Sequence, residues 1–366
     1  MVMTERRRPF VFVVAPISPP LTGVAAATES ILDYFRTRTD IRLANISPGT
    51  ANALVRHVTK IWRTFLGCLR LVVHARAPSR VLYMSVDGGG GILYNIAVAL
   101  TGRLLRFKIF AHHHSFAYID SKSALMACFT RAVGASGTHI VLCPAMAAGL
   151  RKVYSTSLRT LELSGAALLL PQPRSEFRTG LDFRLGFLSN LIVEKGLDTS
   201  VELLRTARKE GLPVRLVLVG RVPDDRAGSL VEAAKREFGT AFEYRGPIPE
   251  NEKKNFFHDI DVFVFPTRYV NEAQPRAVLE ALAHGVPVLT IARSCITSDM
   301  GEGAGICVER HKNFVAETMP IVRSWCSNRV LLRNAGARAA ERGVQLHISG
   351  LQQLARLVDH FEQDAS

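Results

Sequence analysis

Two glutamates in the second half of the chain, Glu272 and Glu280, are separated by seven residues. Glu272 stands in a polar loop after an apolar run, and Glu280 stands inside the helix expected after that loop. A helix N-terminus at the carboxyl end of a parallel strand favours phosphate, because its free N–H groups and its macrodipole attract negative charge. Carboxylates at this place would repel a diphosphate, but they accept hydrogen bonds from hydroxyl groups. We therefore expect both glutamates to bind the hydroxyls of a sugar-containing ligand.

The elements that must position these glutamates are a strand, a helix and a second strand. The apolar run at 262–265 is typical of a strand buried on both faces of a parallel sheet, and Pro266 ends it. Pro275 suits the first residue of a helix, because its fixed φ fits the first turn and its missing N–H is not needed there. The helix is expected to end near Gly285, and a second buried strand follows at 286–291.

This unit resembles a known family. Glu272 and Glu280 match the E-x(7)-E signature of retaining glycosyltransferases with the GT-B fold, notably glycosyltransferase family 4. The segments NEAQP at 271–275 and EALAHGVPV at 280–288 are also similar to that family. The resemblance implies an α/β protein of two facing Rossmann-like domains with a cleft between them. The alternative is structural: Glu272 caps the helix, and Glu280 lies on its solvated face.

The resemblance also implies roles for the residues of this unit. Glu272 is expected to hold hydroxyls of the donor sugar, and Glu280 those of the ribose. Lys195 and the helix N-terminus near Ala273 and Gln274 would neutralise the leaving diphosphate. The acceptor hydroxyl attacks from the face of the leaving phosphate, which takes its proton. This chemistry needs no metal, no cofactor beyond the nucleotide-sugar substrate, and no protein nucleophile.

A second motif lies at the start of the second half, at 189–196. It resembles the family element G-R-L-x-x-x-K-G, whose Arg and Lys hold the donor phosphates. Lys195 matches, whereas Asn190 stands where the family has Arg. Gly246 lies in a turn that runs close to the base in the family. An ordinary surface lysine is the alternative interpretation of Lys195.

The first half contributes three adjacent histidines and a glycine loop. The histidines follow a buried strand expected at 107–111. Neighbouring side chains of an extended chain point to opposite sides, so three cannot converge on zinc. In the family a histidine at the end of this strand faces the donor sugar, and His112 and His114 are both candidates. Gly23, in the loop after the first strand, has room for a close backbone approach to the donor or acceptor. An ordinary strand–helix turn is the alternative for that loop.

The charge of the chain is unevenly placed. The formal net charge is +14, and residues 1–180 hold 22 Lys and Arg against 8 Asp and Glu, while the remainder holds 24 of each. A basic half indicates an anionic partner, such as a membrane surface, a nucleic acid or an acidic acceptor. The helix expected at 51–76 has an apolar and a basic face. The apolar residues are Leu54, Val58, Ile61, Phe65 and Leu69, and the basic residues are Arg56, Lys60, Arg63 and Arg70. It is either a core helix with a solvated basic face or an interfacial helix on anionic lipid, with Trp62 at its edge.

Length and composition indicate two domains with full cores. We predict a first domain at 1–172, a linker at 173–183 and a nucleotide-sugar-binding domain at 184–347, with a C-terminal helix at 348–366 packing back on the first domain. The six cysteines show no C-x-x-C pair, so we interpret them as reduced thiols. No window approaches the ~20 apolar residues of a transmembrane helix. A cytoplasmic protein, peripheral at most on the inner face of the membrane, is therefore expected.

These observations predict a nucleotide-sugar-dependent glycosyltransferase acting on a saccharide or lipid-linked acceptor, in cell-envelope or exopolysaccharide synthesis. Two other classes remain. A related sugar phosphorylase would need a lysine set for pyridoxal phosphate, which nothing in the sequence singles out. A basic nucleic-acid-binding module would need aromatic residues interleaved with the basic ones, and no such signature is present, so we expect no nucleic-acid partner.

Overall fold

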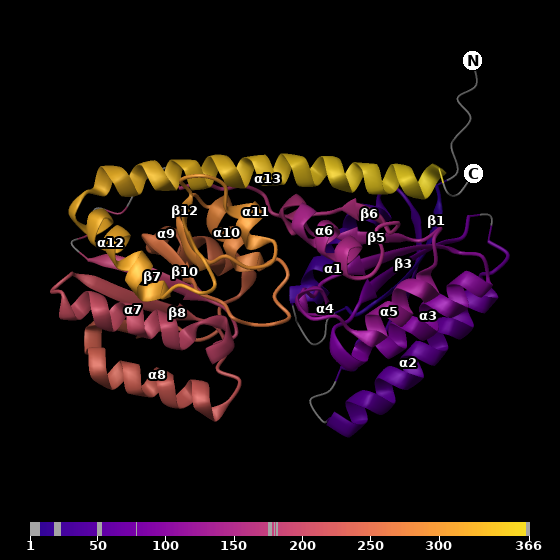
Figure 1. The fold of residues 1–366 in the computed structure, drawn as a ribbon, viewed down its shortest axis with the longest axis horizontal. Helices are drawn as coiled ribbons and strands as arrows, with labels where there is room; N and C mark the ends of the chain where they lie inside the picture. Colours follow the sequence, from indigo (N-terminus) through magenta and orange to yellow (C-terminus); the bar gives the residue numbers. More distant parts are fainter. Residues whose placement is uncertain are drawn as a thin grey trace, which may run out of the picture. The chain divides into compact units, whose positions relative to one another are not determined.

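The computed structural model describes residues 8–17, 23–49, 53–77, 79–174, 178, 180 and 182–363. The chain forms two compact units, one of residues 1–168 with 349–366 and one of residues 169–348 (Figure 1). Each unit contains one six-stranded sheet in which all the strand pairs are parallel. The expected α/β class with two Rossmann-like domains is thereby confirmed.

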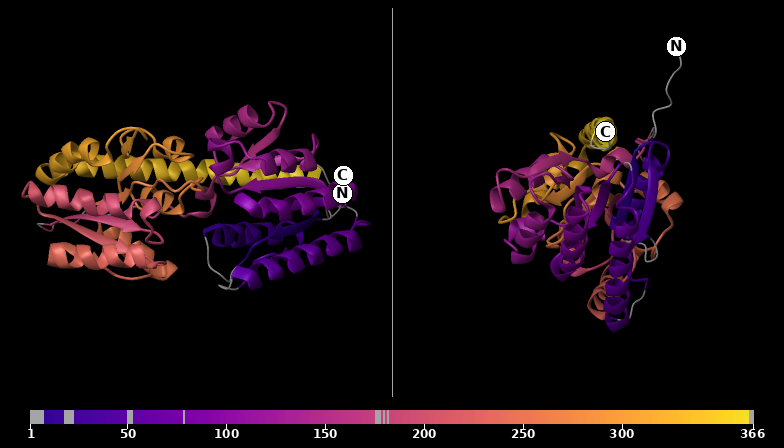
Figure 2. Two further views of the ribbon diagram at one scale, coloured as in Figure 1. Left: turned by 60° about the horizontal axis from the view of Figure 1, so that its bottom comes forward. Right: turned by 90° about the vertical axis from the view of Figure 1, so that its right-hand side faces the viewer.

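The sheet of the first unit has the strand order β2-β1-β3-β4-β5-β6. Its strands are β1 (Phe10–Ala15), β2 (Asp40–Asn45), β3 (Val81–Val86), β4 (Lys108–His113), β5 (Thr138–Val141) and β6 (Arg159–Glu162). The helices are α1 (Gly23–Arg36), α2 (Ala53–Val73), α3 (Ile92–Leu104), α4 (Ala117–Asp120), α5 (Ala124–Val133) and α6 (Pro144–Val153). Every residue of β1 and β3 is buried, as expected for apolar strands covered on both faces. Helix α2 lies beside α3 in each view (Figures 1 and 2).

The sheet of the second unit has the order β9-β8-β7-β10-β11-β12. Its strands are β7 (Phe183–Leu188), β8 (Val214–Val219), β9 (Phe242–Tyr244), β10 (Val262–Phe265), β11 (Val288–Ile291) and β12 (Gly305–Val308). The helices are α7 (Leu197–Lys209), α8 (Asp225–Phe238), α9 (Lys253–Asp259), α10 (Arg276–Ala283), α11 (Ile296–Met300) and α12 (Phe314–Ser327). Counted along the chain, this is the Rossmann order 3-2-1-4-5-6, which reverses between β7 and β10. Ligands bind at the carboxyl ends of the strands beside such a reversal.

The last helix, α13 (Arg329–Gln363), contributes to both units. Within the first unit, Leu354, Leu357 and Phe361 join the core formed by α1, β1 and β3. Ser164 N–H there donates to Gln353 Oε1 at 2.9 Å. Within the second unit, a Cβ on Gly343 would lie 2.6 Å from the carbonyl oxygen of Leu282, so only glycine fits this approach.

The expected linker is in part a packed segment. Arg174 is buried and donates from its guanidinium to the carbonyl oxygens of Ile260, at 2.7 Å, and Asp261, at 3.3 Å. Gln172 N–H donates to the carbonyl oxygen of Ala283 at 2.9 Å. The chain just before the second domain is therefore fixed on that domain, while residues 175–177, 179 and 181 lie outside the described part.

Of the two interpretations of α2, a core helix or an interfacial helix, the structure contradicts the core helix. Val58, Ile61, Phe65 and Leu69 are 50–59% exposed, and the side chain of Leu54 lies outside the described part. The helix instead packs through a narrow strip of Thr64, Gly67 and Leu71, all of which are buried. The other side of the helix therefore faces outward.

Candidate functional site

The loops that follow β7 and β10 lie at the reversal of the second sheet. The β7 loop carries Asn190 and Lys195, and the β10 loop carries Glu272, Ala273 and Gln274. Because β7 and β10 are hydrogen-bonded neighbours, both loops leave the sheet at the same edge. The residues predicted separately from two motifs thus come from adjacent loops.

Lys195 and Glu272 form an ion pair. The Lys195 Nζ and Glu272 Oε2 atoms are 3.5 Å apart, and the two side chains are only 22% and 11% exposed. The Lys195 ammonium also lies 5.6 Å from the ring centre of Tyr269, a residue that sequence analysis missed. Glu272 Oε2 is buried and accepts no hydrogen bond from the described residues, so it has capacity for a ligand hydroxyl. A cation and an acceptor are therefore held side by side.

Glycine makes this close packing of loops possible. Gly196 adopts a φ of +94°, and a Cβ on it would lie 2.6 Å from the carbonyl oxygen of Pro266. Gly220, after β8, has a φ of +139°, and its Cβ would lie 1.6 Å from the carbonyl oxygen of Ser189. Any side chain at these positions would push the Lys195 loop away from its neighbours.

Asn190 and Gly246 lie at the same edge of the sheet, in loops tied to β8. Gly220 N–H donates to the carbonyl oxygen of Gly246 at 2.9 Å, and Leu191 N–H donates to that of Arg221 at 2.9 Å. The Asn190 side chain is exposed, and Gly246 has a φ of +71° with open space where a Cβ would be. Their roles toward phosphate and base stay predictions.

The β10 loop is held by the segment that precedes and forms α11. Ser294 Oγ donates to the carbonyl oxygen of Glu272 at 2.6 Å, and Cys295 N–H donates to that of Ala273 at 3.0 Å. Arg293 donates to the carbonyl oxygen of Val270 at 3.0 Å. Three consecutive residues thus fix the backbone on both sides of the predicted sugar-binding glutamate.

A buried carboxyl group completes this support. The Gln274 amide donates to both carboxylate oxygens of Asp299, at 3.0 and 3.1 Å. Burial raises the pKa of Asp299 to about 7, although the Gln274 hydrogen bonds and the charge of Arg342 lower it. Arg342 also donates to the carbonyl oxygen of Asp299 at 2.9 Å. Sequence analysis missed Asp299 and Arg342, because neither belongs to the motif that carries Gln274.

We expect Asp299→Asn to flatten the pH dependence of stability. The folded pKa lies above the unfolded value of ~3.9, so this group stabilises the fold fully below that value and the stability is lost as the pH rises through 7. Between pH 5.5 and pH 8 the loss is about 2 kcal/mol in the parent protein. Chemical unfolding at both pH values measures the free energy of unfolding. Subtracting the value of the variant from that of the parent removes the contributions of all titrating groups that the two proteins share.

Asp299→Ala serves as the matched control, because it removes the acceptor of the Gln274 amide as well as the charge. It should lower stability at both pH values and weaken any ligand held by the β10 loop. A parent and an Asn variant that lose stability equally between pH 5.5 and pH 8 would contradict a buried, titrating Asp299.

Glu280 is buried, so the interpretation of a residue on a solvated helix face is wrong. Its Oε1 atom accepts from Arg276 Nε at 2.7 Å and from Lys253 Nζ at 2.9 Å. Both cations also contact Glu250, at 3.1 and 2.8 Å. The Oε2 atom of Glu280 is buried without a hydrogen bond from any described residue. One oxygen is thus fixed by two cations and the other is available to a ligand hydroxyl.

The capping interpretation of Glu272 is also wrong. The N-cap residue of α10 is Pro275, which makes no side-chain capping hydrogen bond. Pro275 itself was expected as the first helical residue, but the helix begins at Arg276. Glu272 therefore lies in the loop, where its carboxylate faces Lys195.

In the first unit, His112 and His114 lie on the same side of β4, as expected from the alternation of an extended chain. Their ring centres are 4.1 Å apart, and Tyr83 Oη lies 2.6 Å from His112 Nδ1. Burial lowers the pKa of His112 well below its usual value and that of His114 to about 4, so both imidazoles are neutral at pH 7. Both Nε2 atoms are buried and without a hydrogen bond among the described residues. These atoms can bond a neutral hydroxyl.

His113 belongs to a separate network on the opposite side. Its Nδ1 atom lies 2.8 Å from Tyr118 Oη, and its Nε2 atom lies 2.9 Å from His139 Nδ1. The described residues contain no group of three or more His, Cys, Asp or Glu side chains placed to hold a metal ion. The three adjacent histidines therefore divide between two environments.

The predicted role of Gly23 stays a prediction. Gly23 begins α1, whereas residues 18–22 of its loop lie outside the described part.

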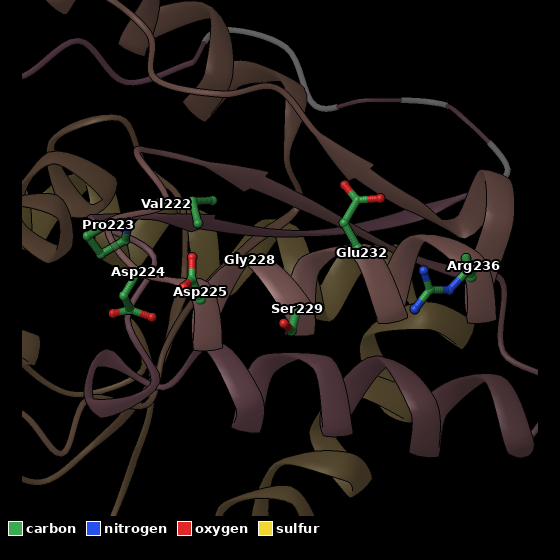
Figure 3. A pocket seen from close by; sticks show the side chains of 8 residues that line it. All are labelled: Val222, Pro223, Asp224, Asp225, Gly228, Ser229, Glu232 and Arg236. Carbon is green, nitrogen blue, oxygen red and sulfur yellow. The ribbon is translucent and has the colours of Figure 1, made fainter.

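A surface pocket beside α8 has the wrong charge for a diphosphate (Figure 3). Its volume is about 630 Å³, and none of the predicted site residues lines it. The lining residues are Val222, Pro223, Asp224, Asp225, Gly228, Ser229, Glu232 and Arg236. Asp224 is already used locally, because its carboxylate accepts from Ala227 N–H at 2.8 Å and caps the helix. With three acids and one arginine, this pocket is not suited to bind phosphate.

Comparison with known proteins finds sequence similarity in the second unit. A family model described as glycosyl transferases group 1 matches residues 182–323. The putative colanic acid biosynthesis glycosyltransferase WcaL of Salmonella typhimurium is 30% identical over 128 residues, 34% of this chain and 31% of that protein. WcaL of Escherichia coli is 30% identical over 114 residues, 30% of this chain and 28% of that protein. The matched part spans about a third of the length of these relatives.

Solved structures match over almost the whole chain. Sucrose-phosphate synthase from Thermosynechococcus elongatus has a TM-score of 0.70 at 14% identity, covering 96% of this chain and 99% of that one. HepE from Anabaena, in complex with UDP-glucose, has a TM-score of 0.66 at 13% identity, covering 96% and 99%. TarM from S. aureus, solved with UDP, has a TM-score of 0.59 at 15% identity, covering 80% and 58%. These likenesses confirm the expected GT-B fold.

Proposed function

We propose that the chain transfers a sugar from a nucleoside diphosphate sugar to an acceptor hydroxyl, with retention of configuration, because residues 182–323 match a family model described as glycosyl transferases group 1. The observation that carries this proposal is the Lys195–Glu272 pair at the reversal of the second sheet, with the buried Glu280 in the helix that follows. The pair offers one cation for phosphate and one acceptor for hydroxyls within a single ion pair.

The proposed reaction uses these groups without a metal or a resident cofactor. Lys195 and the free N–H groups at the start of α10 stabilise the charge that develops on the leaving diphosphate. The bond from the sugar C1 to the phosphate oxygen breaks, and the bond from C1 to the acceptor oxygen forms on the same face. The acceptor proton passes to the departing phosphate oxygen. Glu272 orients the sugar through its hydroxyls, and Glu280 holds the ribose. The neutral His112 or His114 contacts the donor sugar.

We further propose a saccharide or lipid-linked acceptor in cell-envelope or exopolysaccharide synthesis, at the cytoplasmic face of the membrane. The relatives that match the second unit are named for colanic acid biosynthesis, which supports this class of acceptor. Structural neighbours were solved with UDP or UDP-glucose, so uridine nucleotides are the first donors to test.

The experiment is a thermal-shift screen of nucleoside diphosphates, their sugars, free nucleosides and a short RNA. A ligand of the folded state stabilises by mass action, about 2.7 kcal/mol at a hundredfold excess over Kd. We expect one nucleoside diphosphate and its sugar to stabilise the protein more than the nucleoside does. Stabilisation by RNA alone, lost at high salt, would instead favour the polyanion-binding class.

A further inference from the structure

Helix α2 exposes a continuous apolar stripe. Eight large apolar side chains on this one helix are 49–73% exposed: Val55, Val58, Ile61, Trp62, Phe65, Leu69, Val72 and Val73. Their spacing of three and four residues puts most of them on one side of the helix, over a length of about 27 Å at 1.5 Å per residue. Single exposed apolar residues are ordinary, but contiguous patches mark interaction sites.

The orientation of this stripe is fixed by contacts on the other side of the helix. Lys60 Nζ pairs with Asp87 Oδ2 at 2.7 Å, and the Arg63 guanidinium donates to the carbonyl oxygen of Ser47. A Cβ on Gly67 would lie 3.6 Å from Ala44 Cβ, so the helix backbone approaches β2 closely. The helix cannot turn its apolar side inward without breaking these contacts.

The neighbouring helix α3 also exposes large apolar side chains. Leu93, Leu100 and Leu104 on α3 are 57%, 51% and 83% exposed. Helices α2 and α3 pack beside each other in the first unit (Figures 1 and 2).

The charged side chains of these two helices are all basic. The sequences of α2 and α3 contain no Asp or Glu. Arg56 and Arg70 on α2 are exposed, and the first 180 residues hold the entire net charge of the chain. An apolar stripe bordered by cations complements a surface with an anionic face and an apolar interior.

We propose that the apolar stripe of α2, continued by α3, docks the protein on an anionic lipid bilayer, with α2 lying in the plane of the interface. No helix among the described residues is long and apolar enough to cross a membrane, which fits an interfacial arrangement. Trp62 and Phe65 stack with ring centres 5.9 Å apart, and aromatic rings favour the depth of the lipid headgroups. The inference does not depend on sugar transfer, because it rests only on the first unit.

The structure alters which basic residues meet the lipid. Of the four expected to do so, Lys60 and Arg63 are held by Asp87 and Ser47. Arg56 and Arg70 are the cations of α2 that are exposed. The apolar side chains therefore carry the docking, and the cations select the lipid charge.

The test is sedimentation with vesicles of phosphatidylcholine alone or mixed with phosphatidylglycerol, with tryptophan emission as a second readout. Of the two tryptophans, Trp62 is 59% exposed and Trp325 is buried, so a shift on binding reports on Trp62. The triple variant Ile61→Ser, Phe65→Ser, Leu69→Ser keeps Trp62 as the probe. Because all three side chains are at least half exposed, the fold should be retained. We expect the parent to bind mixed vesicles with a blue shift of Trp62 emission, and the triple variant to bind at least about tenfold more weakly.

The matched control is Val330→Ser, Leu331→Ser, Ile348→Ser, which removes three comparably exposed apolar side chains of α13. It should bind vesicles like the parent.

The double variant Arg56→Gln, Arg70→Gln should show a reduced preference for phosphatidylglycerol. Equal vesicle binding by the parent and the triple variant would overturn the proposal. The proposal would also be overturned if the parent does not bind vesicles and is a dimer, while the triple variant is a monomer. A second copy of the chain would then cover the stripe. Nucleotide binding by the triple variant, which should be unchanged, separates this result from failure of the proposed function.

Discussion

Glu272→Gln is expected to lower sugar transfer by about 100-fold or more, while the affinity for the nucleoside diphosphate is retained or increases up to about fivefold. The carboxylate is the acceptor proposed for the donor-sugar hydroxyls, so its loss acts where the sugar reacts. The same carboxylate lies 3.5 Å from Lys195 Nζ. Neutralising it releases the ammonium for phosphate, so the affinity for the diphosphate should not fall.

Lys195→Ala is the matched variant, because it removes the other half of the pair. It should weaken nucleoside diphosphate binding by about 10- to 100-fold, the value of one or two charge-assisted hydrogen bonds, and leave nucleoside binding unchanged. Calorimetric titration of both ligands against both variants, with initial rates of transfer, separates the two roles. If Glu272→Gln and Lys195→Ala change rate and affinity in the same ratio, the pair is a structural link and the assignment of separate roles fails.

The core of the fold was predictable from the sequence, whereas several sheet edges were not. Strand β10 is the apolar run expected at 262–265, and the strands expected at 107–111 and 286–291 overlap β4 and β11. The sequence predicts no strand at the positions of β2, β6 and β12. Each of these three strands forms an edge of its sheet. An edge strand carries exposed polar residues, such as Asp40 and Arg42 on β2. These interrupt the run of apolar residues by which a buried strand is recognised in the sequence.

Periodicity also could not tell what the apolar face of α2 contacts. The spacing of Val58, Ile61, Phe65 and Leu69 correctly indicates an amphipathic helix. An apolar face against a protein core and one against lipid have the same sequence pattern. Only the position of the small buried strip, with Gly67 at its centre, shows which side faces the sheet.

In the candidate site, the sequence motifs predicted the motif residues but not the residues that hold the motif loops in place. Lys195, Glu272 and Glu280 could be located because their spacing within strand–loop–helix units is regular. Asp299 lies 25 residues beyond Gln274, and a single buried carboxyl has no local sequence signal. Contacts between segments distant in the chain appear only when the sheet order brings those segments together.

Glu280→Gln is expected to remove the discrimination between ribose and deoxyribose nucleotides. The Oε2 atom of Glu280 is buried and accepts no hydrogen bond from the part of the chain that the structure describes, and a ribose hydroxyl donating to it would gain about 1.5–3 kcal/mol. The parent should therefore bind the ribonucleoside diphosphate at least about tenfold more tightly than the 2′- or 3′-deoxy analogue. The glutamine variant keeps the size of the side chain but lacks the charge, so its preference should fall to about threefold or less.

Glu280→Ala tests the structural contribution of the same group. Removing the carboxylate leaves the buried side of Arg276 and Lys253 without its acceptor, although both cations still contact Glu250. We expect a loss of stability of about 3 kcal/mol, beyond that of the glutamine variant. Titrations with the ribo and deoxy ligands, at a temperature where all the proteins are folded, keep binding separate from stability. A glutamine variant that still prefers the ribonucleotide as strongly as the parent would show that Glu280 only anchors the two cations, and the ribose would then be held by another group.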